Sequence, residues 1–335
     1  MDLIPTESQI QSILSSENNY HYIPLTTNHS SWIVHIPKLI QSSQSHSQQQ
    51  SSNSRQILFH DYFQRHPIDK HPIYIYGKQT YENRYSQMYM IPPSTSSVPV
   101  SKSNNDNDNG DDTRDDEGIS TLLLTEYKYS GTFKKCFVCD VTIPQERFVV
   151  ELCRVADYIY RNLPPNLAKT TTTTTMTTSP TTPTTTTATA IPTSSSIYNG
   201  CLVNWYEPNH TIGLHADDEK ELDNSYPIMS LSWGGPRRFL LRPKKYTLNY
   251  IQKVTDILLK DGDWIIMGGK CQEEFKHEIP KLRKCDGPSS KRISWTIRKM
   301  INPTNQNPKT TTKKQKMPAS LSTSKVVYNP YAKKK

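Results

Sequence analysis

Residues 197–300 alternate short apolar runs with turn-forming residues, and this pattern constrains the fold more than any other part of the chain. The runs occupy residues 201–206, 227–233, 238–242, 263–267 and 292–298. Turn-forming residues such as Pro208, Gly234 and Gly262 stand between them. Short strands without intervening helices are typical of an antiparallel sandwich or barrel. The sequence therefore predicts a mainly β (α+β) fold.

One amphipathic helix is predicted before this region, at residues 148–162. Phe148, Leu152, Val155 and Ile159 recur there at the spacing of one helical face. Such a face packs inward. We therefore expect this helix to contribute to the core rather than to a site.

Low-complexity tracts divide the chain. They are rich in Ser, Gln, Asn, Asp, Thr or Lys, and they occupy residues 41–54, 94–118, 170–196 and 302–335. These tracts cannot bury enough apolar surface to offset the entropy of ordering, so we expect them to be disordered. The expected organisation is an N-terminal extension (residues 1–90), an acidic linker (residues 91–118), a main domain (residues 119–300) with a Thr-rich insertion (residues 170–196), and a basic tail (residues 301–335).

The charge of the chain favours a polyanionic partner, although a solvated basic surface is the alternative. The formal net charge is +9, and neutralising phosphates releases counterions. No apolar run is long enough to cross a membrane, so no membrane association is expected. The first residues lack the basic and apolar regions of a secretory signal.

The cysteines are sparse, which is typical of reduced thiols in the cytosol or nucleus. Cys136 and Cys139 form a C-x-x-C pair that could be half of a zinc site. No second close pair follows, and Phe137 and Val138 between them favour a strand instead.

A possible metal site begins at His215 and Asp217. Residues two apart on a strand share a face, so this imidazole and this carboxylate would converge. His210 and His277 are the candidates for a third ligand. Two histidines and one carboxylate leave open positions on a metal, which suits Fe(II) enzymes that also bind a cosubstrate and oxygen. A closed zinc site would need a fourth ligand.

Residues 292–298 alternate strictly. Arg292, Ser294, Thr296 and Arg298 would share one face of a strand, with apolar residues on the other. Arginines inside a barrel need an anionic partner. A dicarboxylate such as 2-oxoglutarate fits this need because guanidinium binds carboxylate in a bidentate manner. A solvent-exposed edge strand is the alternative.

Taken together, these motifs resemble the AlkB family of nucleic-acid dioxygenases, most closely its DNA-repair members. The resemblance covers residues 197–300 and continues weakly into residues 76–77 and 127–131. It is carried by the motifs at residues 204–206, 215–219, 227–234, 237–239, 277–280 and 292–298. It implies a double-stranded β-helix (jelly-roll) core with flanking N-terminal helices and a nucleotide-recognition lid.

The resemblance also implies roles for individual residues. The Fe(II) ligands would be His215, Asp217 and His277. The residues that bind 2-oxoglutarate would be Asn204, Tyr206, Arg292, Ser294, Thr296 and Arg298. Ser294 stands where the family commonly has Asn, so its shorter side chain departs from the pattern.

Substrate contacts are implied in the same way. Tyr129 would stack on a flipped base, Glu219 would read its edge, Asp218 would shape the site and Tyr76 would belong to the lid. Phosphate contacts would come from two basic clusters, Arg242, Lys244 and Lys245, and Lys281, Arg283 and Lys284.

The function that the resemblance implies is oxidative demethylation of N-alkylated bases in DNA, such as 1-methyladenine and 3-methylcytosine. Fe(II) would be the cofactor, and O2 and 2-oxoglutarate would be consumed, with succinate, carbon dioxide and formaldehyde as products. The alternatives are an RNA or tRNA demethylase, a protein hydroxylase, and a non-catalytic nucleic-acid binder. We expect a monomer in the nucleus, with the cytoplasm as an additional location.

Overall fold

The structure is a computed structural model of the chain. It describes residues 3–40, 48–91, 124–164, 167, 196–283 and 290–301, with the backbone alone for residues 48–55. Lys284 lies outside the described residues, as do the low-complexity tracts apart from residues 48–54 and 196. Residues Met1–Pro303 form one unit, and the expected basic tail falls outside the described part.

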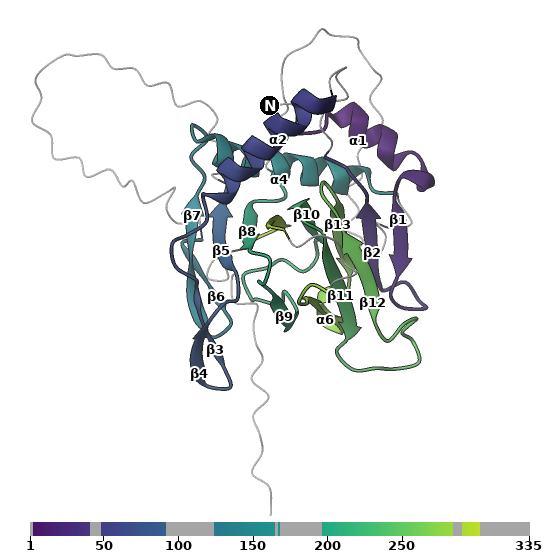
Figure 1. Cartoon of the computed structure of the whole chain (residues 1–335). Helices are drawn as coiled ribbons and strands as arrows, with labels where there is room; N and C mark the ends of the chain where they lie inside the picture. Colours follow the sequence, from purple (N-terminus) through teal and green to yellow (C-terminus); the bar gives the residue numbers. More distant parts are fainter. Residues whose placement is uncertain are drawn as a thin grey trace, which may run out of the picture. The chain divides into compact units, whose positions relative to one another are not determined.

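Two β-sheets form the centre of this unit (Figure 1). The nine-stranded sheet contains, in order, β1 (His21–Pro24), β2 (Ser31–Ile36), β13 (Trp264–Gly269), β10 (Ile228–Gly234), β15 (Arg292–Arg298), β8 (Gly200–Tyr206), β5 (Tyr85–Met90), β7 (Thr132–Val138) and β6 (Glu126–Tyr129). Its strands pair antiparallel except for β5 and β7. The four-stranded sheet contains β12 (Thr255–Leu259), β11 (Arg237–Pro243), β14 (Phe275–Ile279) and β9 (Ile212–His215). The predicted mainly β, jelly-roll fold is confirmed.

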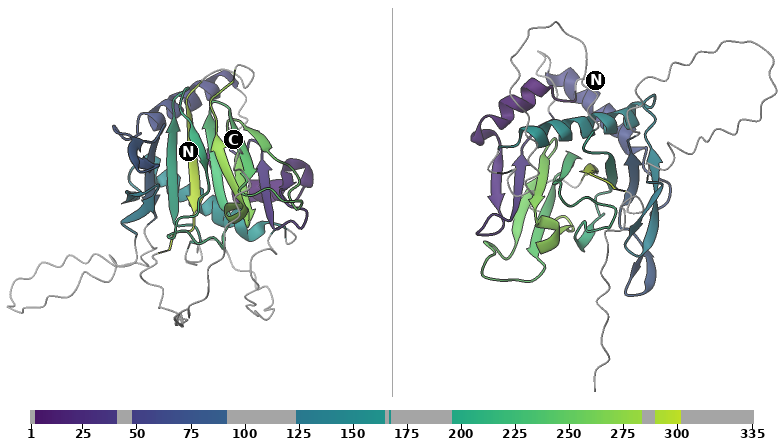
Figure 2. Two further views of the ribbon diagram at one scale, coloured as in Figure 1. Left: turned by 90° about the horizontal axis from the view of Figure 1, so that it is seen from below. Right: turned by 180° about the vertical axis from the view of Figure 1, so that it is seen from behind.

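The helices cover one face of the large sheet (Figure 2). They are α1 (Glu7–Leu14), α2 (Gln48–Phe63) and α4 (Pro144–Asn162), with short helices η1 (Glu17–Asn19) and α6 (Cys271–Glu274) elsewhere. The predicted helix is confirmed as α4, which starts earlier because Pro144 can occupy the first helical turn. Its predicted inward face, from Phe148 to Ile159, is buried.

Side-chain alternation on β15 places apolar and polar residues on opposite faces of the strand. Ile293, Trp295 and Ile297 join the core between the large sheet and the helices. Arg292 and Arg298, on the other face, line a cavity between the two sheets. The period-two pattern seen in the sequence therefore sorts apolar side chains to the helix side and polar ones to the cavity side.

The N-terminal part is not a separate extension, which corrects the expected boundary at residue 90. Strand β2 pairs with β13, and β5 pairs with β8, so both belong to the large sheet. Strand β2 is buried along nearly its whole length. Its backbone satisfies the ladder hydrogen bonds that β13 would otherwise lack on that side. The hairpin of β3 (Pro72–Ile75) and β4 (Lys78–Tyr81) also comes from this part.

Residues 48–54 were expected to be disordered but lie in helix α2, and this expectation was wrong. The segment contains neither Gly nor Pro, and Gln is a good helix former. The helix is anchored at its other end, where Tyr62 and Phe63 are buried in the core.

Within the described residues, no helix has the length and apolar character needed to cross a lipid bilayer.

Candidate active site

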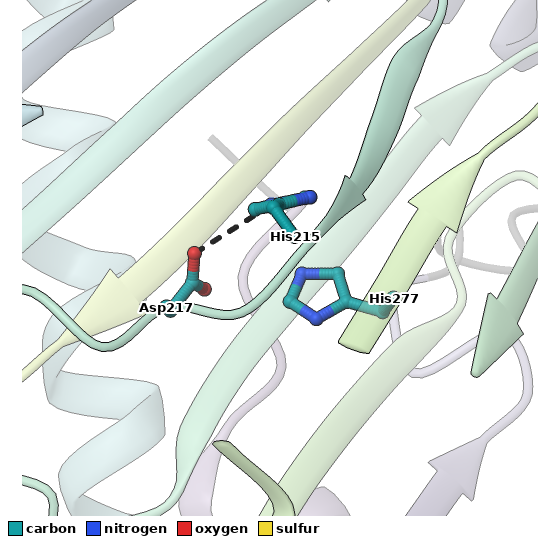
Figure 3. A group of neighbouring side chains, drawn as sticks. All are labelled: His215, Asp217 and His277. Atoms are coloured by element: carbon teal, nitrogen blue, oxygen red, sulfur yellow. Dashed lines mark ion pairs between the residues drawn. The ribbon is translucent and has the colours of Figure 1, made fainter. Parts of the chain in front are cut away.

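Three side chains converge at one end of the small sheet. His215 and His277 are paired residues on the neighbouring strands β9 and β14. Asp217 lies just after β9, not within it as the H-x-D spacing argument assumed. Their ligand atoms all lie within 4.8 Å of one another. Figure 3 shows the three side chains facing a common point, with His215 Nε2 3.7 Å from Asp217 Oδ1.

Neighbouring groups orient these side chains. His215 Nδ1 is 2.8 Å from the carbonyl oxygen of Gly213. A carbonyl only accepts, so Nδ1 donates and Nε2 keeps its lone pair for a metal. The backbone N–H of Asp217 donates to Gln272 Oε1 at 2.9 Å. Gln272 lies on α6 and is buried, so this contact fixes the chain at Asp217.

The site favours the protonation states that bind metals. Burial lowers the pKa of His277 to about 3 and also lowers the pKa of His215, so both imidazoles are neutral. Burial opposes ionisation of Asp217, but Arg298 and the two histidines outweigh it and lower the pKa of this carboxyl to about 2. Neutral imidazole and ionised carboxylate are the forms that coordinate a divalent cation.

Arg292 is a buried cation that faces the cavity. Its Nε donates to Ser232 Oγ at 2.8 Å and its Nη2 donates to Ser294 Oγ at 3.2 Å. The guanidinium lies 5.1 Å from the centroid of the Tyr206 ring. Among the described residues, Nη1 has no hydrogen-bond partner. Burial lowers the pKa of Arg292, and Tyr206 offsets part of this shift, whereas no carboxylate among the described residues contributes to it.

Arg298 lies at the metal end of the same strand. Its Nη2 is 2.8 Å from Asp217 Oδ1, and its Nε and Nη1 have no hydrogen-bond partner in the described part of the chain. Although burial opposes the charge, Asp217 and Glu219 raise the pKa of Arg298. The guanidinium is thus a permanent cation beside the ligands.

A single cavity brings these groups together. Its lining includes the three candidate metal ligands and the six residues that were predicted to bind 2-oxoglutarate, Asn204, Tyr206, Arg292, Ser294, Thr296 and Arg298. Arg84 and Tyr129 also line it. Arg84 donates to Asn204 Oδ1 from Nε and to Tyr129 Oη from Nη2, each at 2.7 Å. Arg84 therefore joins the side of the cavity with Asn204 to the side with Tyr129.

The other residues predicted to contact a base lie outside the cavity lining. Glu219 is partly buried, and burial raises its pKa to about 7. Asp218 is exposed and lies 3.1 Å from Lys244 Nζ. Tyr76 is 101% exposed at the turn between β3 and β4. Of the four predicted base contacts, the structure brings only Tyr129 to the cavity wall.

The predicted phosphate contacts are surface residues. The described ones, Arg242, Lys244, Lys245, Lys281 and Arg283, are exposed. Arg242 pairs with Glu278 at 3.2 Å, and Lys244 pairs with Asp218. These acidic neighbours already compensate part of the charge that would face a phosphate.

The alternative metal candidates lie elsewhere. His210 Nδ1 accepts from the backbone N–H of Glu207, and its Nε2 is 3.0 Å from Lys70 Nζ. Cys136 and Cys139 are buried, and burial raises the pKa of each to about 12. The described residues contain one group with metal-ligand geometry, and it includes none of these three.

The residues present fit Fe(II) and 2-oxoglutarate. Two imidazoles and one carboxylate on one side of the metal are the donor set of Fe(II) oxygenases. Arg292, which is 2% exposed and has an unsatisfied Nη1, needs an anion in the cavity. A dicarboxylate that reaches from Arg292 toward the ligands meets both requirements.

Comparisons with known proteins identify several similar proteins. A family model described as the 2OG-Fe(II) oxygenase superfamily matches residues 147–298. Alpha-ketoglutarate-dependent dioxygenase alkB homolog 3 of Mus musculus is 33% identical over 113 residues, covering 31% of this chain and 37% of that protein. DNA oxidative demethylase ALKBH2 of Arabidopsis thaliana is 30% identical over 125 residues, covering 32% and 39%. The solved structure of OsALKBH1 aligns with a TM-score of 0.39 at 14% identity, covering 79% of this chain and 97% of that one.

The fold, the ligand set and the family model define a 2OG-Fe(II) oxygenase, whose cofactor is Fe(II) and whose cosubstrates are 2-oxoglutarate and O2. The matched segments span under two fifths of the length of the two curated relatives. Within the superfamily, the matched part of the chain is similar to proteins of the AlkB family.

Sequence reasoning missed Arg84, Gln272 and Ser232 as site residues. Arg84 and Asn204 are 120 positions apart, and Arg292 and Ser232 are 60 positions apart. Ser232 carried a usable signal, because Ser230 and Ser232 alternate with apolar residues in the sequence, and Ser232 lies opposite Ser294 in the sheet. Arg84 and Gln272 carried none, since neither stands in a periodic pattern.

Proposed function

We propose that this protein oxidatively demethylates N-alkylated nucleobases in DNA, of the 1-methyladenine and 3-methylcytosine type. One observation carries the proposal: a single cavity holds the three metal ligands, three buried arginines and the ring of Tyr129. Two similar proteins are named a dioxygenase and a DNA oxidative demethylase. The net charge of +9 also favours a polyanionic substrate.

Each group of residues has a distinct task in this proposal. When bound, Fe(II) with 2-oxoglutarate and O2 supplies the oxidation of an alkyl carbon, with succinate and carbon dioxide as by-products. Arg292 binds a carboxylate of the cosubstrate, and Ser232 and Ser294 orient its guanidinium. Arg298 keeps Asp217 ionised.

The substrate side has to hold a flat base near the ligands and exclude water. Tyr129 offers an aromatic ring for stacking, and Arg84 fixes that ring through its hydroxyl. A base must leave the duplex to reach such a cavity, at a cost of a few kcal/mol, which is smaller where methylation has already disrupted pairing. Lesions on the pairing edge are therefore the expected substrates.

The direct test is release of formaldehyde from a DNA oligonucleotide that contains 1-methyladenine, with Fe(II) and 2-oxoglutarate added. We expect formaldehyde and succinate in equal amounts, and loss of both in His215→Ala. Arg154→Gln is a matched control, because Arg154 is exposed on α4 and pairs with Glu151 far from the ligand strands. Loss of product in this control would point to general damage instead.

Parallel reactions separate the alternative substrates. Formaldehyde from the same lesion in RNA, with none from DNA, would assign an RNA demethylase. Succinate without formaldehyde from either nucleic acid would contradict a demethylase and favour hydroxylation of another substrate. Binding of nucleic acid without succinate or formaldehyde would favour a non-catalytic binder. We also propose the nucleus as the site of action, where a chromosomal DNA substrate would lie.

A further inference from the structure

A buried ion cluster lies beside the cavity. Glu82, Arg84 and Lys134 are 2%, 3% and 3% exposed. Glu82 Oε1 is 3.0 Å from Arg84 Nη2, and Glu82 Oε2 is 3.1 Å from Lys134 Nζ. The Ser86 hydroxyl donates to Glu82 and accepts from Lys134. One carboxylate is thus shared between two cations, and a hydroxyl completes the contacts of the ammonium.

This cluster holds Tyr129 from two directions. Arg84 Nη2 donates to the Tyr129 hydroxyl at 2.7 Å, and Lys134 Nζ lies over the ring, 4.6 Å from its centroid. Tyr129 and Arg84 line the cavity, whereas Lys134 is not among the lining residues. The ammonium therefore contacts the ring without lining the cavity.

We infer that Lys134 is a positioning residue, which holds the ring of Tyr129 in the cavity wall so that an alkylated nucleobase stacks on its open face. This inference rests on the proposed function and deepens it, because it names the device that prepares the base-stacking surface. A cation over the face of a desolvated aromatic ring is attracted by the ring quadrupole. That attraction opposes rotation of the ring out of the wall.

Stability alone does not explain the cluster. A buried ion pair is often no more stabilising than apolar side chains of similar volume, and the buried Cys136, two residues along β7, shows that this face of the strand accepts a side chain without a charge. Burial lowers the pKa of Lys134 to about 8, although Glu82 raises it. The ammonium is therefore charged at neutral pH, as the contact with the ring requires.

The test compares two neighbouring lysines on β7. Lys134→Met removes the charge but keeps the length of the side chain, and Glu82 keeps its pairing with Arg84. Lys135→Met is the control, since Lys135 is exposed on the opposite face, where its Nζ lies 5.2 Å from the Phe137 ring. We expect Lys134→Met to raise the KM for the 1-methyladenine oligonucleotide about tenfold. The KM for 2-oxoglutarate should not change, and the control should alter neither value.

Equal changes in both KM values would overturn the inference, because they would mean a general structural role. An unchanged KM for the oligonucleotide would overturn it as well. If Lys134→Met does not fold, the paired change Glu82→Gln with Lys134→Met removes both charges at once. The same split between the two KM values is expected of it.

A second readout does not depend on turnover. The full-length, metal-free protein is labelled with 13C on its tyrosine rings, and the Tyr129 signal is assigned with Tyr129→Phe. We expect this signal to shift or broaden in Lys134→Met and not in Lys135→Met. Absence of turnover by the wild-type protein would defeat the proposed function alone. The inference would then be decided by this spectrum, and an unchanged Tyr129 signal would overturn it.

Discussion

Individual side chains at the site are held by residues that do not line the cavity. The carbonyl of Gly213 sets the orientation of His215, and Gln272 accepts the backbone N–H of Asp217. Gln272 is 7% exposed and its amide nitrogen donates to Met267 Sδ at 3.3 Å, so its own orientation is fixed. Contacts of this kind reduce the reorganisation that metal binding requires.

Gln272→Leu should weaken Fe(II) binding about tenfold or more, because outer contacts of this kind contribute on that scale. The leucine fills a similar volume but leaves the N–H of Asp217 without its acceptor. Anaerobic titration of the metal-free protein with Fe(II) measures the change. Glu273→Gln, on the same short helix but exposed, is the control and should bind as the wild type does. Equal affinities for Gln272→Leu and the wild type would contradict a role for Gln272.

The sequence could predict some residues of the site but not others, for a physical reason. His215 and Asp217 are close in the chain, and Arg292 and Arg298 share a period-two face, so local geometry brings each pair together. Arg84 reaches the cavity only because β5 pairs with β8. A pairing between strands more than a hundred residues apart leaves no trace in local periodicity.

Among the helices and strands, too, some could be predicted from the sequence and others could not. Helix α4 and strand β15 could be predicted because each has a buried face with a regular period. The start of α2 could not, since its polar residues have no such face and the helix depends on packing at its other end. Strand β2 is buried on both faces, and its short apolar run carries no alternation.

The hairpin of β6 and β7 depends on a glycine in its turn. Gly131 has φ of 84°, and a Cβ there would lie 3.2 Å from Tyr74 Cβ. Gly131→Ala should therefore lower the free energy of unfolding by about 2 kcal/mol, through backbone strain and crowding together. Denaturant unfolding measures this loss of stability.

Gly77 provides the matched control for this change. Its φ is 76°, but nothing lies within 4 Å of an added Cβ. Gly77→Ala should lower the free energy of unfolding by only about 1 kcal/mol, from backbone strain alone. If both variants lose the same stability, the contact between Gly131 and Tyr74 does not constrain the hairpin.

At the scale of the whole unit, the N-terminal part supplies strands to the same sheet that carries the site. Glu82 and Arg84 lie in this part, and Lys134 and Tyr129 lie in the hairpin beyond the undescribed residues 92–123. The ion cluster therefore links segments that the sequence had assigned to different regions. Its titration should be visible in the stability of the whole unit.

Acid should destabilise the protein in two steps. Burial, followed by the charge of Lys134, lowers the pKa of His71 from 6.5 to about 4. The unfolded chain then binds the proton more readily, so this contribution is complete above pH 6.5 and is lost as the pH falls to about 4. Glu82, whose pKa falls from 4.5 to about 2 because Arg84 and Lys134 outweigh burial, loses its contribution below pH 4.5.

His71→Gln separates the first step from the second in denaturant unfolding of the metal-free protein. Gln can still form a hydrogen bond with Thr132 Oγ1, which lies 2.8 Å from His71 Nε2, but it does not titrate. As the pH falls from 6.5 to 4, the free energy of unfolding of the variant should therefore rise relative to that of the wild type by an amount on the order of 2 kcal/mol. His215 and His277 titrate in both proteins, so they cancel in the difference. If the difference in free energy of unfolding between the two proteins does not vary with pH, His71 is solvated in the folded state, and the ion cluster beside Tyr129 is open to water.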